Sequence, residues 1–183
     1  YEGRNLSTKE ILGFCQFLLV AGSETTTLMI GNIIHRLMEN PEQFELLKND
    51  RSLLPNAIEE SLRYDAPVHG LFRTNNIRMT MHGKDIPKNS KVCMMFASAN
   101  RDPKAWDDPN TFNITRDLAD LRNHASFGVG SHYCLGAPLS RLEGSIALNA
   151  IIQRLPNIRN NGEPIRTTAG VLKGFSSLPV RWD

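Results

Sequence analysis

The sequence has few cysteines, and no two of them stand at the spacing of a metal or redox site. Only three occur in 183 residues, at Cys15, Cys93 and Cys134, and none forms a C-x-x-C motif. This argues against a zinc site, a dithiol redox centre and a disulfide framework. Cys15 and Cys93 lie in apolar stretches, where a free thiol is most simply a small buried hydrophobe.

Long apolar runs and an excess of one charge sign are also missing. The longest apolar run, residues 11–22, is shorter than the roughly 20 residues that span a bilayer. The net charge is only +2, and no basic stripe interleaved with aromatics is present. No signal peptide is visible. These absences predict no membrane or nucleic-acid partner and a cytoplasmic location.

The hydrophobic pattern predicts a mainly α fold with small β-sheets, that is, an α+β protein. Ser7-Thr-Lys-Glu10 is a capping box that opens a long helix ending at Glu39. Its first half is apolar on nearly every side, which predicts a central core position. Only one other long apolar helix can cover it, so part of this surface is expected to be exposed. The pattern also predicts helices at 41–48, 54–64 and 137–155, strands at 77–81 and 92–97, a long loop at 100–126, and a closing hairpin at 171–182.

Polar residues interrupt the long helix at AGSETTT, residues 21–27. A polar face turned to solvent is one interpretation, but the apolar residues on both sides favour burial. A buried acid beside a hydroxyl is costly without a partner, so such pairs often mark proton-handling sites. Glu24 and Thr25 are the candidate pair.

Two further charged features are weak evidence for a functional site when each is taken alone. Glu60 and Arg63 form an acid and base pair at i, i+3 on one helix face, as many surface helices do. Arg73 follows that helix and could be an ordinary solvated arginine.

Cys134 lies in a different setting, the stretch FGVGSHYCLG at 127–136. It precedes the helix expected near Ala137, whose unpaired N–H groups and dipole favour the thiolate, the form that binds metals. Gly128, Gly130 and Gly136 would let the backbone approach a flat ligand, and Phe127 and Tyr133 supply apolar packing. A buried free cysteine in a turn is the alternative.

Together these motifs resemble the cytochromes P-450, most closely the soluble bacterial members. The haem-binding signature F-x-x-G-x-x-x-C-x-G corresponds to Phe127, Gly130, Cys134 and Gly136. The family's other landmarks follow in order along the chain: A-G-x-E-T-T at 21–26, E-x-x-R at Glu60 and Arg63, an arginine at 73, and P-x-x-F at Pro109 and Phe112.

The resemblance implies roles around haem b. Cys134 would be the axial iron ligand, whose electron donation promotes O–O cleavage. Glu24 and Thr25 would steer water and protons toward dioxygen, with Ala21 and Gly22 leaving space for it. Arg73 and His132 would bind the haem propionates. The remaining cofactor-binding positions are Phe127, Gly128 and Gly136.

The resemblance also makes Glu60 and Arg63 a buried structural pair, completed by a third polar residue. Asn110 and Thr111 stand where many relatives carry an arginine. Arg116 or His124 could supply that third group, and both alternatives stay open.

Residues 1–183 would then be a single partial domain, the C-terminal half of the fold, with the N-terminal half absent. This part would contain the long central helix, the cysteine-ligand loop and the following helix. The pocket residues within it are mostly small and apolar, which predicts a hydrophobic substrate. They are Val20, Val68, His69, Gly70, Leu71 and Ser177.

Three functions compete. The resemblance implies a monooxygenase that hydroxylates an organic substrate with O2, taking NAD(P)H electrons through a ferredoxin or flavodoxin and its reductase. The alternative is a truncated, inactive haem-binding or structural remnant. A third makes Cys134 a hydrolytic nucleophile with His132 or His124 as its base, but no orienting third group is recognisable.

Overall fold

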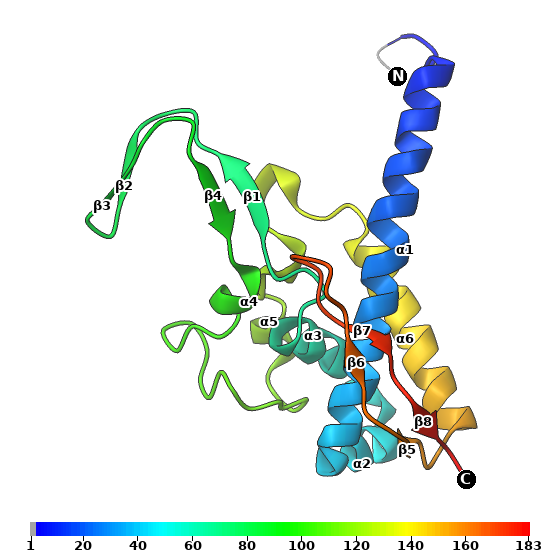
Figure 1. Cartoon of the computed structure of the whole chain (residues 1–183). Helices are drawn as coiled ribbons and strands as arrows, with labels where there is room; N and C mark the ends of the chain where they lie inside the picture. Colours follow the sequence, from blue (N-terminus) through cyan, green and yellow to red (C-terminus); the bar gives the residue numbers. More distant parts are fainter. Residues whose placement is uncertain (1–2) are drawn as a thin grey trace.

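The computed structural model describes residues 3–183, most of whose regular structure is helical (Figure 1). Helix α1 (Thr8–Glu39) is the longest and packs beside α6 (Ala137–Arg154). Helix α3 (Leu54–Tyr64) contacts both, and α2 (Pro41–Asn49) contacts α1. The short helical segments are η1 (Arg51–Leu53), α4 (Phe96–Ala99), α5 (Leu118–Leu121), η2 (Ala125–Phe127) and η3 (Gly130–His132). The predicted mainly helical fold is confirmed.

The ends of α1 follow local sequence signals. The Ser7 hydroxyl accepts a hydrogen bond from the Glu10 backbone N–H at 3.3 Å, and the Glu10 carboxylate accepts from the Ser7 N–H at 2.8 Å. This confirms the predicted capping box. The helix stops at Glu39 because Asn40 precedes Pro41, which disfavours helical backbone in the residue before it.

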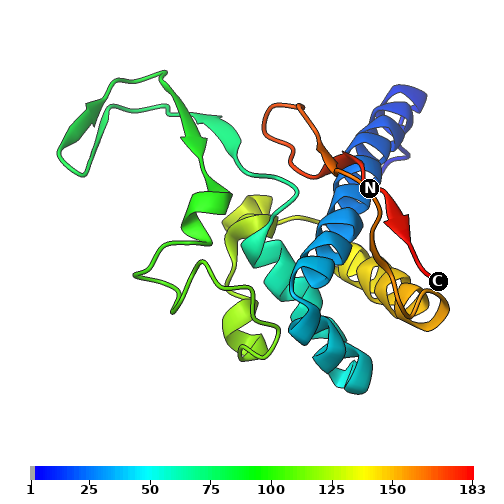
Figure 2. The same cartoon turned by 60° about the horizontal axis from the view of Figure 1, so that its bottom comes forward.

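The apolar core surrounds the second half of α1, where α2, α3 and α6 meet it (Figure 2). Met29 and Ile33 of α1 pack there with Ile58 of α3 and Leu148 of α6. A Cβ at Gly144 would lie 2.9 Å from the Met29 Cε atom, so this glycine permits the close approach of α6 to α1. Residues in the 100–126 loop, such as Phe112, fill the core from the far side of α3.

The first half of α1 is exposed, so its predicted core position is wrong for this chain. Phe17 is 60% exposed and Leu19 is 71% exposed. Figure 1 shows this half of the helix extending beyond the rest of the molecule. By length and composition alone α1 could cross a membrane, but the core helix of a soluble protein meets the same criterion. The expectation that part of this apolar surface is exposed is confirmed.

The strands of the described residues form four antiparallel pairs. The pairs are β1 (Leu71–Thr74) with β4 (Lys91–Met94), β2 (Met79–Met81) with β3 (Lys84–Ile86), β5 (Arg159–Asn160) with β8 (Val180–Arg181), and β6 (Ile165–Arg166) with β7 (Phe175–Ser177). Strands were predicted near β2 and β4, whereas β1 and β3 were not. The predicted closing hairpin is wrong, because β7 and β8 each pair with an earlier strand and not with each other.

Candidate functional site

A cavity of about 690 Å³ lies between the middle of α1, the segment after α3 and the stretch that contains Cys134. It brings together residues from four separate parts of the chain. Its walls include Ala21, Gly22, Thr25 and Thr26 of α1, Val68, Leu71 and Arg73 after α3, Met94 and Phe96, and Phe127, Gly128, His132, Cys134 and Gly136. The size falls within the range of small-molecule and cofactor sites.

We call residues 127–136 the cysteine loop. Cys134 carries a free, exposed thiol on the cavity wall. Its backbone N–H donates to the Phe127 carbonyl oxygen at 2.8 Å, which closes the loop. Gly128 and Gly130 have φ values of 72° and 70°, a region that favours glycine. The loop leads directly into α6, whose N-cap is Gly136.

Arg73 and His132, the two residues predicted to bind the propionates, both line the cavity. Arg73 lies in β1, opposite Val92 of β4. Its guanidinium donates to the carbonyl oxygen of its neighbour Phe72 at 3.1 Å. Within residues 3–183, neither Arg73 nor His132 has a carboxylate partner. The cavity wall therefore offers a cationic group that is open to an anionic ligand.

The α1 wall of the cavity is formed by one helix face. Ala21, Gly22, Thr25 and Thr26 share this face, and the Thr25 hydroxyl donates to the Ala21 carbonyl oxygen at 2.9 Å. Glu24 lies off this face and is exposed, so the predicted burial of this acid is wrong in this chain. Ala21 and Gly22 are exposed as well.

Two of the predicted pocket residues, Val68 and Leu71, line the cavity, together with residues that were not predicted, such as Leu18 and Leu19. The other four residues do not line this cavity, and their place in a substrate pocket stays a prediction. Gly70 is buried against β4, where an added Cβ would lie 2.8 Å from the Met94 carbonyl oxygen. The others outside the lining are Val20, His69 and Ser177.

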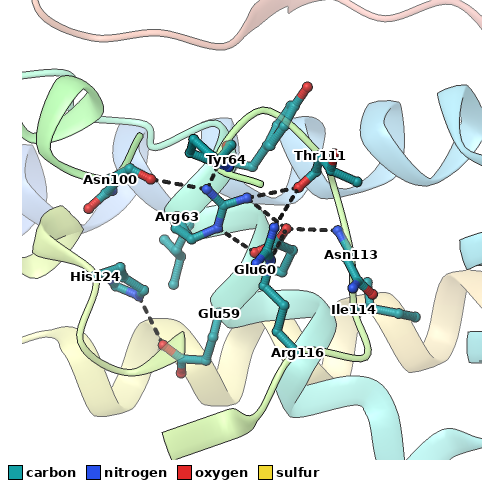
Figure 3. Close-up of polar contacts among 12 residues, drawn as sticks. Glu59, Glu60, Arg63, Tyr64, Asn100, Thr111, Asn113, Ile114, Arg116 and His124 are labelled. Carbon is teal, nitrogen blue, oxygen red and sulfur yellow. Dashed lines mark hydrogen bonds and ion pairs between the residues drawn. The ribbon is translucent and has the colours of Figure 1, made fainter. Parts of the chain in front are cut away.

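The Glu60–Arg63 pair is completely buried, which rules out the surface interpretation (Figure 3). Arg63 Nε donates to Glu60 at 2.6 Å, and Nη2 donates to the same carboxylate at 2.8 Å. The remaining Arg63 donors reach backbone carbonyl oxygens of the 100–126 loop. These are the carbonyls of Asn100, Pro109 and Thr111, at 2.9 to 3.0 Å. The pair thus fastens that loop to α3.

The third member of this network is Arg116. Its Nε lies 3.4 Å from a Glu60 carboxylate oxygen (Figure 3). Its Nη atoms donate to the Asp107 and Asp108 carbonyls. His124, the other candidate, points to Glu59 instead. The sequence left this choice open because both residues lie in the same long loop.

Glu59 is a second buried acid, adjacent to Glu60 but with different partners. His124 Nε2 lies 2.9 Å from its carboxylate (Figure 3), and Arg141 of α6 donates to it through both Nε and Nη2. Burial opposes ionisation of this acid, but the hydrogen bonds from His124 and Arg141 outweigh that effect and hold the pKa of Glu59 at about 2. The carboxylate is therefore ionised at neutral pH.

Sequence reasoning missed Glu59, Arg141 and Tyr133 as members of one network. The available signal was the pair of adjacent acids in a helix whose neighbours are mostly apolar. Adjacent residues on a helix point to different sides, so only one of them can pair with Arg63. A second buried acid requires its own partners.

The family model described as Cytochrome P450 matches residues 1–169. The chain belongs to the cytochrome P450 family. It is 42% identical to Cytochrome P450 107B1 of Saccharopolyspora erythraea over 98% of this chain and 45% of that protein. It is 38% identical to the cytochrome P450 monooxygenase PikC of Streptomyces venezuelae, over 99% of this chain and 44% of that protein. The chain thus spans about half the length of the curated relatives it matches.

Solved structures show the same relationship. The chain superposes on CYP109E1 of Bacillus megaterium in complex with testosterone with a TM-score of 0.94 and 39% identity. The alignment covers 100% of this chain and 51% of that one. This confirms that the fold is part of the cytochrome P450 fold.

Membership of this P450 family implies a haem, and the cavity fits one. A flat, largely apolar ligand with an iron centre and anionic edges needs a donor for the iron, such as a thiolate, together with close backbone approach and cationic partners. The cavity offers the Cys134 thiol, glycines at 22, 128 and 136, and the Arg73 guanidinium, which has no carboxylate partner within residues 3–183. A Cβ at Gly136 would lie 3.8 Å from the Cys134 sulfur, so glycine leaves the thiol side of the loop open.

Proposed function

We propose that this chain forms the haem-thiolate part of a monooxygenase that inserts one oxygen atom of O2 into a hydrophobic organic substrate, typically by hydroxylation. One observation carries the proposal: a single cavity gathers the cysteine loop, a cation without a carboxylate partner and the hydroxyl-bearing face of α1. When bound, haem b supplies the O2 activation, and thiolate ligation favours O–O cleavage.

The chain's own residues bind and orient that group. Cys134 would supply the iron ligand from the loop, and Arg73 and His132 would hold the propionates through charge-assisted hydrogen bonds. Phe127, Gly128 and Gly136 would pack closely against the ring, as would Ala21 and Gly22 from the opposite wall. All of these residues line the same cavity.

Thr25 would hold water and pass protons into the cavity. Its hydroxyl lies on the cavity wall and already donates to the Ala21 carbonyl oxygen, so it can accept a further hydrogen bond. Glu24 precedes it and faces solvent, where its carboxylate would exchange protons with water. The pair would thus connect solvent to the reacting centre.

Substrate and partners follow the same proposal. Val68 and Leu71 give the cavity an apolar wall, and the relative CYP109E1 is known in complex with the steroid testosterone. Electrons would come from NAD(P)H through a ferredoxin or flavodoxin and its reductase. We further propose that residues 1–183 are the C-terminal half of a single P450 domain and that the protein is cytoplasmic.

An inactive remnant is the second candidate, favoured by the exposed apolar half of α1. Such a chain would retain the cavity without turning over substrate. Haem binding with a thiolate signature but no product formation would support the remnant over the monooxygenase.

The iron ligand is tested by replacing each cysteine in the longest polypeptide that the gene encodes. The reduced, CO-bound parent protein is expected to show the red-shifted Soret band of thiolate ligation. Cys134→Ser should lose it, whereas Cys15→Ser and Cys93→Ser should keep it, because neither residue lines the cavity. If all three variants keep the band, Cys134 is not the ligand.

A further inference from the structure

The cysteine loop has little internal support. Residues 129–136 are all exposed, and the backbone hydrogen bonds within the loop join Cys134 to Phe127 and Tyr133 to Gly130. Two glycines in the left-handed region add conformational freedom in the unfolded chain. The position of the Cys134 sulfur therefore depends on what holds the two ends of the loop.

At the entry of the loop, His124 connects two elements. Its Nδ1 accepts a hydrogen bond from the Ser126 backbone N–H at 3.1 Å, so the ring proton lies on Nε2. That Nε2–H donates to the Glu59 carboxylate, 2.9 Å away. The Ser126 hydroxyl donates to the Leu62 carbonyl oxygen at 2.7 Å. The segment just before Phe127 is thus joined to α3 at two points.

At the exit, Arg141 makes the matching connection from α6. Its Nη2 donates to Glu59 at 3.0 Å, and its Nη1 lies 3.2 Å from the Tyr133 hydroxyl. The guanidinium carbon also lies 4.6 Å from the centre of the Phe127 ring. Arg141 therefore contacts both the first residue of the loop and the residue before Cys134.

We propose that Glu59, His124 and Arg141 are positioning residues that fix the cysteine loop, and with it the Cys134 thiol, against the cavity. A single buried carboxylate holds the loop entry through His124 and the loop exit through Arg141. Loss of this carboxylate removes one connection at each end at the same time. The inference rests on the proposed function, because it assigns these residues to the thiolate ligand of that site.

A second buried acid with an arginine partner, at the C-terminal end of α3, provides a matched control. Asp65 caps α3 and is also buried, and Arg36 binds it through Nε at 3.0 Å and Nη2 at 2.7 Å. Arg166 adds a second cation at 3.3 Å. This pair has the same chemistry as Glu59 with Arg141, but none of its hydrogen bonds or ion pairs within residues 3–183 reaches the cysteine loop.

The experiment compares Glu59→Gln and Arg141→Lys with Asp65→Asn and Arg36→Lys, each in the haem-loaded, longest polypeptide that the gene encodes. The measured quantity is the rate at which the reduced, CO-bound protein converts from the thiolate Soret band to the non-thiolate band. Substitution of groups that support metal ligands typically lowers metal affinity or activity about 10- to 100-fold. We expect the first two variants to convert about 10-fold faster or more, and the two controls to match the parent.

Each outcome decides the question. Equal rates in all four variants, or equal acceleration in variants and controls, overturn the positioning role while leaving the haem-thiolate assignment intact. Arg141→Lys leaves a positive charge beside the buried Glu59 carboxylate. This variant therefore tests the positioning role if Glu59→Gln yields no soluble protein. If neither folds while both controls do, the network serves the fold and the proposal is overturned. A parent protein without the thiolate band overturns both this inference and the proposed function.

Discussion

Two threonines of α1, two residues apart and therefore on different sides of the helix, show how one side chain acquires a role that its neighbour lacks. Thr25 and Thr27 each donate a 2.9 Å hydrogen bond to the carbonyl oxygen four residues earlier. Their local conformations are therefore alike. Thr25 lines the cavity, whereas Thr27 is exposed and does not. The helical rotation between the two residues places the Thr25 hydroxyl, which we propose handles protons, on the cavity wall and the Thr27 hydroxyl away from it.

Replacing Thr25 by alanine is expected to leave haem binding intact and to lower the amount of product formed per NAD(P)H consumed. Without the hydroxyl, water and protons are no longer ordered at the cavity wall, so electrons are diverted to peroxide. The measurement is product and peroxide per NAD(P)H. Thr27→Ala is the matched control and should behave as the parent. Unchanged coupling in Thr25→Ala would contradict the role.

At the scale of the element, α3 organises two separate networks within one turn. Glu60 and Arg63 fasten the 100–126 loop through backbone carbonyls, while Glu59 holds the entry and exit of the cysteine loop. The helix is short, and its buried face carries charge that water cannot reach. Such charges persist only where each has its partners.

Arg63→Ala is expected to destabilise the protein by about 3–5 kcal/mol, because it leaves the Glu60 carboxylate buried beside fewer partners. It should yield little soluble haem protein with a lowered melting temperature. Arg78→Ala is the control, since Arg78 pairs with Asp85 on an exposed hairpin, where an ion pair contributes only about 0–1 kcal/mol. A normal yield and an unchanged melting temperature in Arg63→Ala would show that the Glu60–Arg63 pair does not contribute to the stability of the protein.

At the scale of the whole molecule, the apolar surface is unevenly covered. The second half of α1 is enclosed by α2, α3 and α6, but the first half has no cover within the described residues (Figures 1 and 2). The neighbouring face of α6 is exposed as well, with Ile146 at 62%. Contiguous apolar patches beyond several hundred Å² mark an interaction surface or an aggregation hazard.

The 183-residue polypeptide, expressed alone, is therefore expected to self-associate or aggregate and to bind haem weakly. Exposed Phe17, Leu19 and their neighbours supply the driving force, because burying them removes apolar area from water. Sedimentation and haem titration of the isolated chain measure both effects. A monodisperse monomer that takes up stoichiometric haem and shows the thiolate band would refute the expectation.

Local features could be predicted from the sequence. The start of α1 at its capping box, its end before Pro41, and the bounds of α3 and α6 follow from hydrogen bonds and backbone restrictions among neighbouring residues. The family resemblance pointed to the cysteine loop and to Thr25, Arg73 and His132, because its motifs are contiguous or follow in a recognisable order, and these residues line one cavity.

Contacts between distant residues were decided only by the tertiary structure. Arg116 and His124 lie in one long loop, and nothing local states which of them reaches Glu60 and which reaches Glu59. The pairing of β7 and β8 with earlier strands, and the exposure of half of α1, likewise depend on elements far apart in the chain. Side-chain type and local spacing set what a residue can bind, whereas burial and partner choice depend on which elements the folded chain brings together.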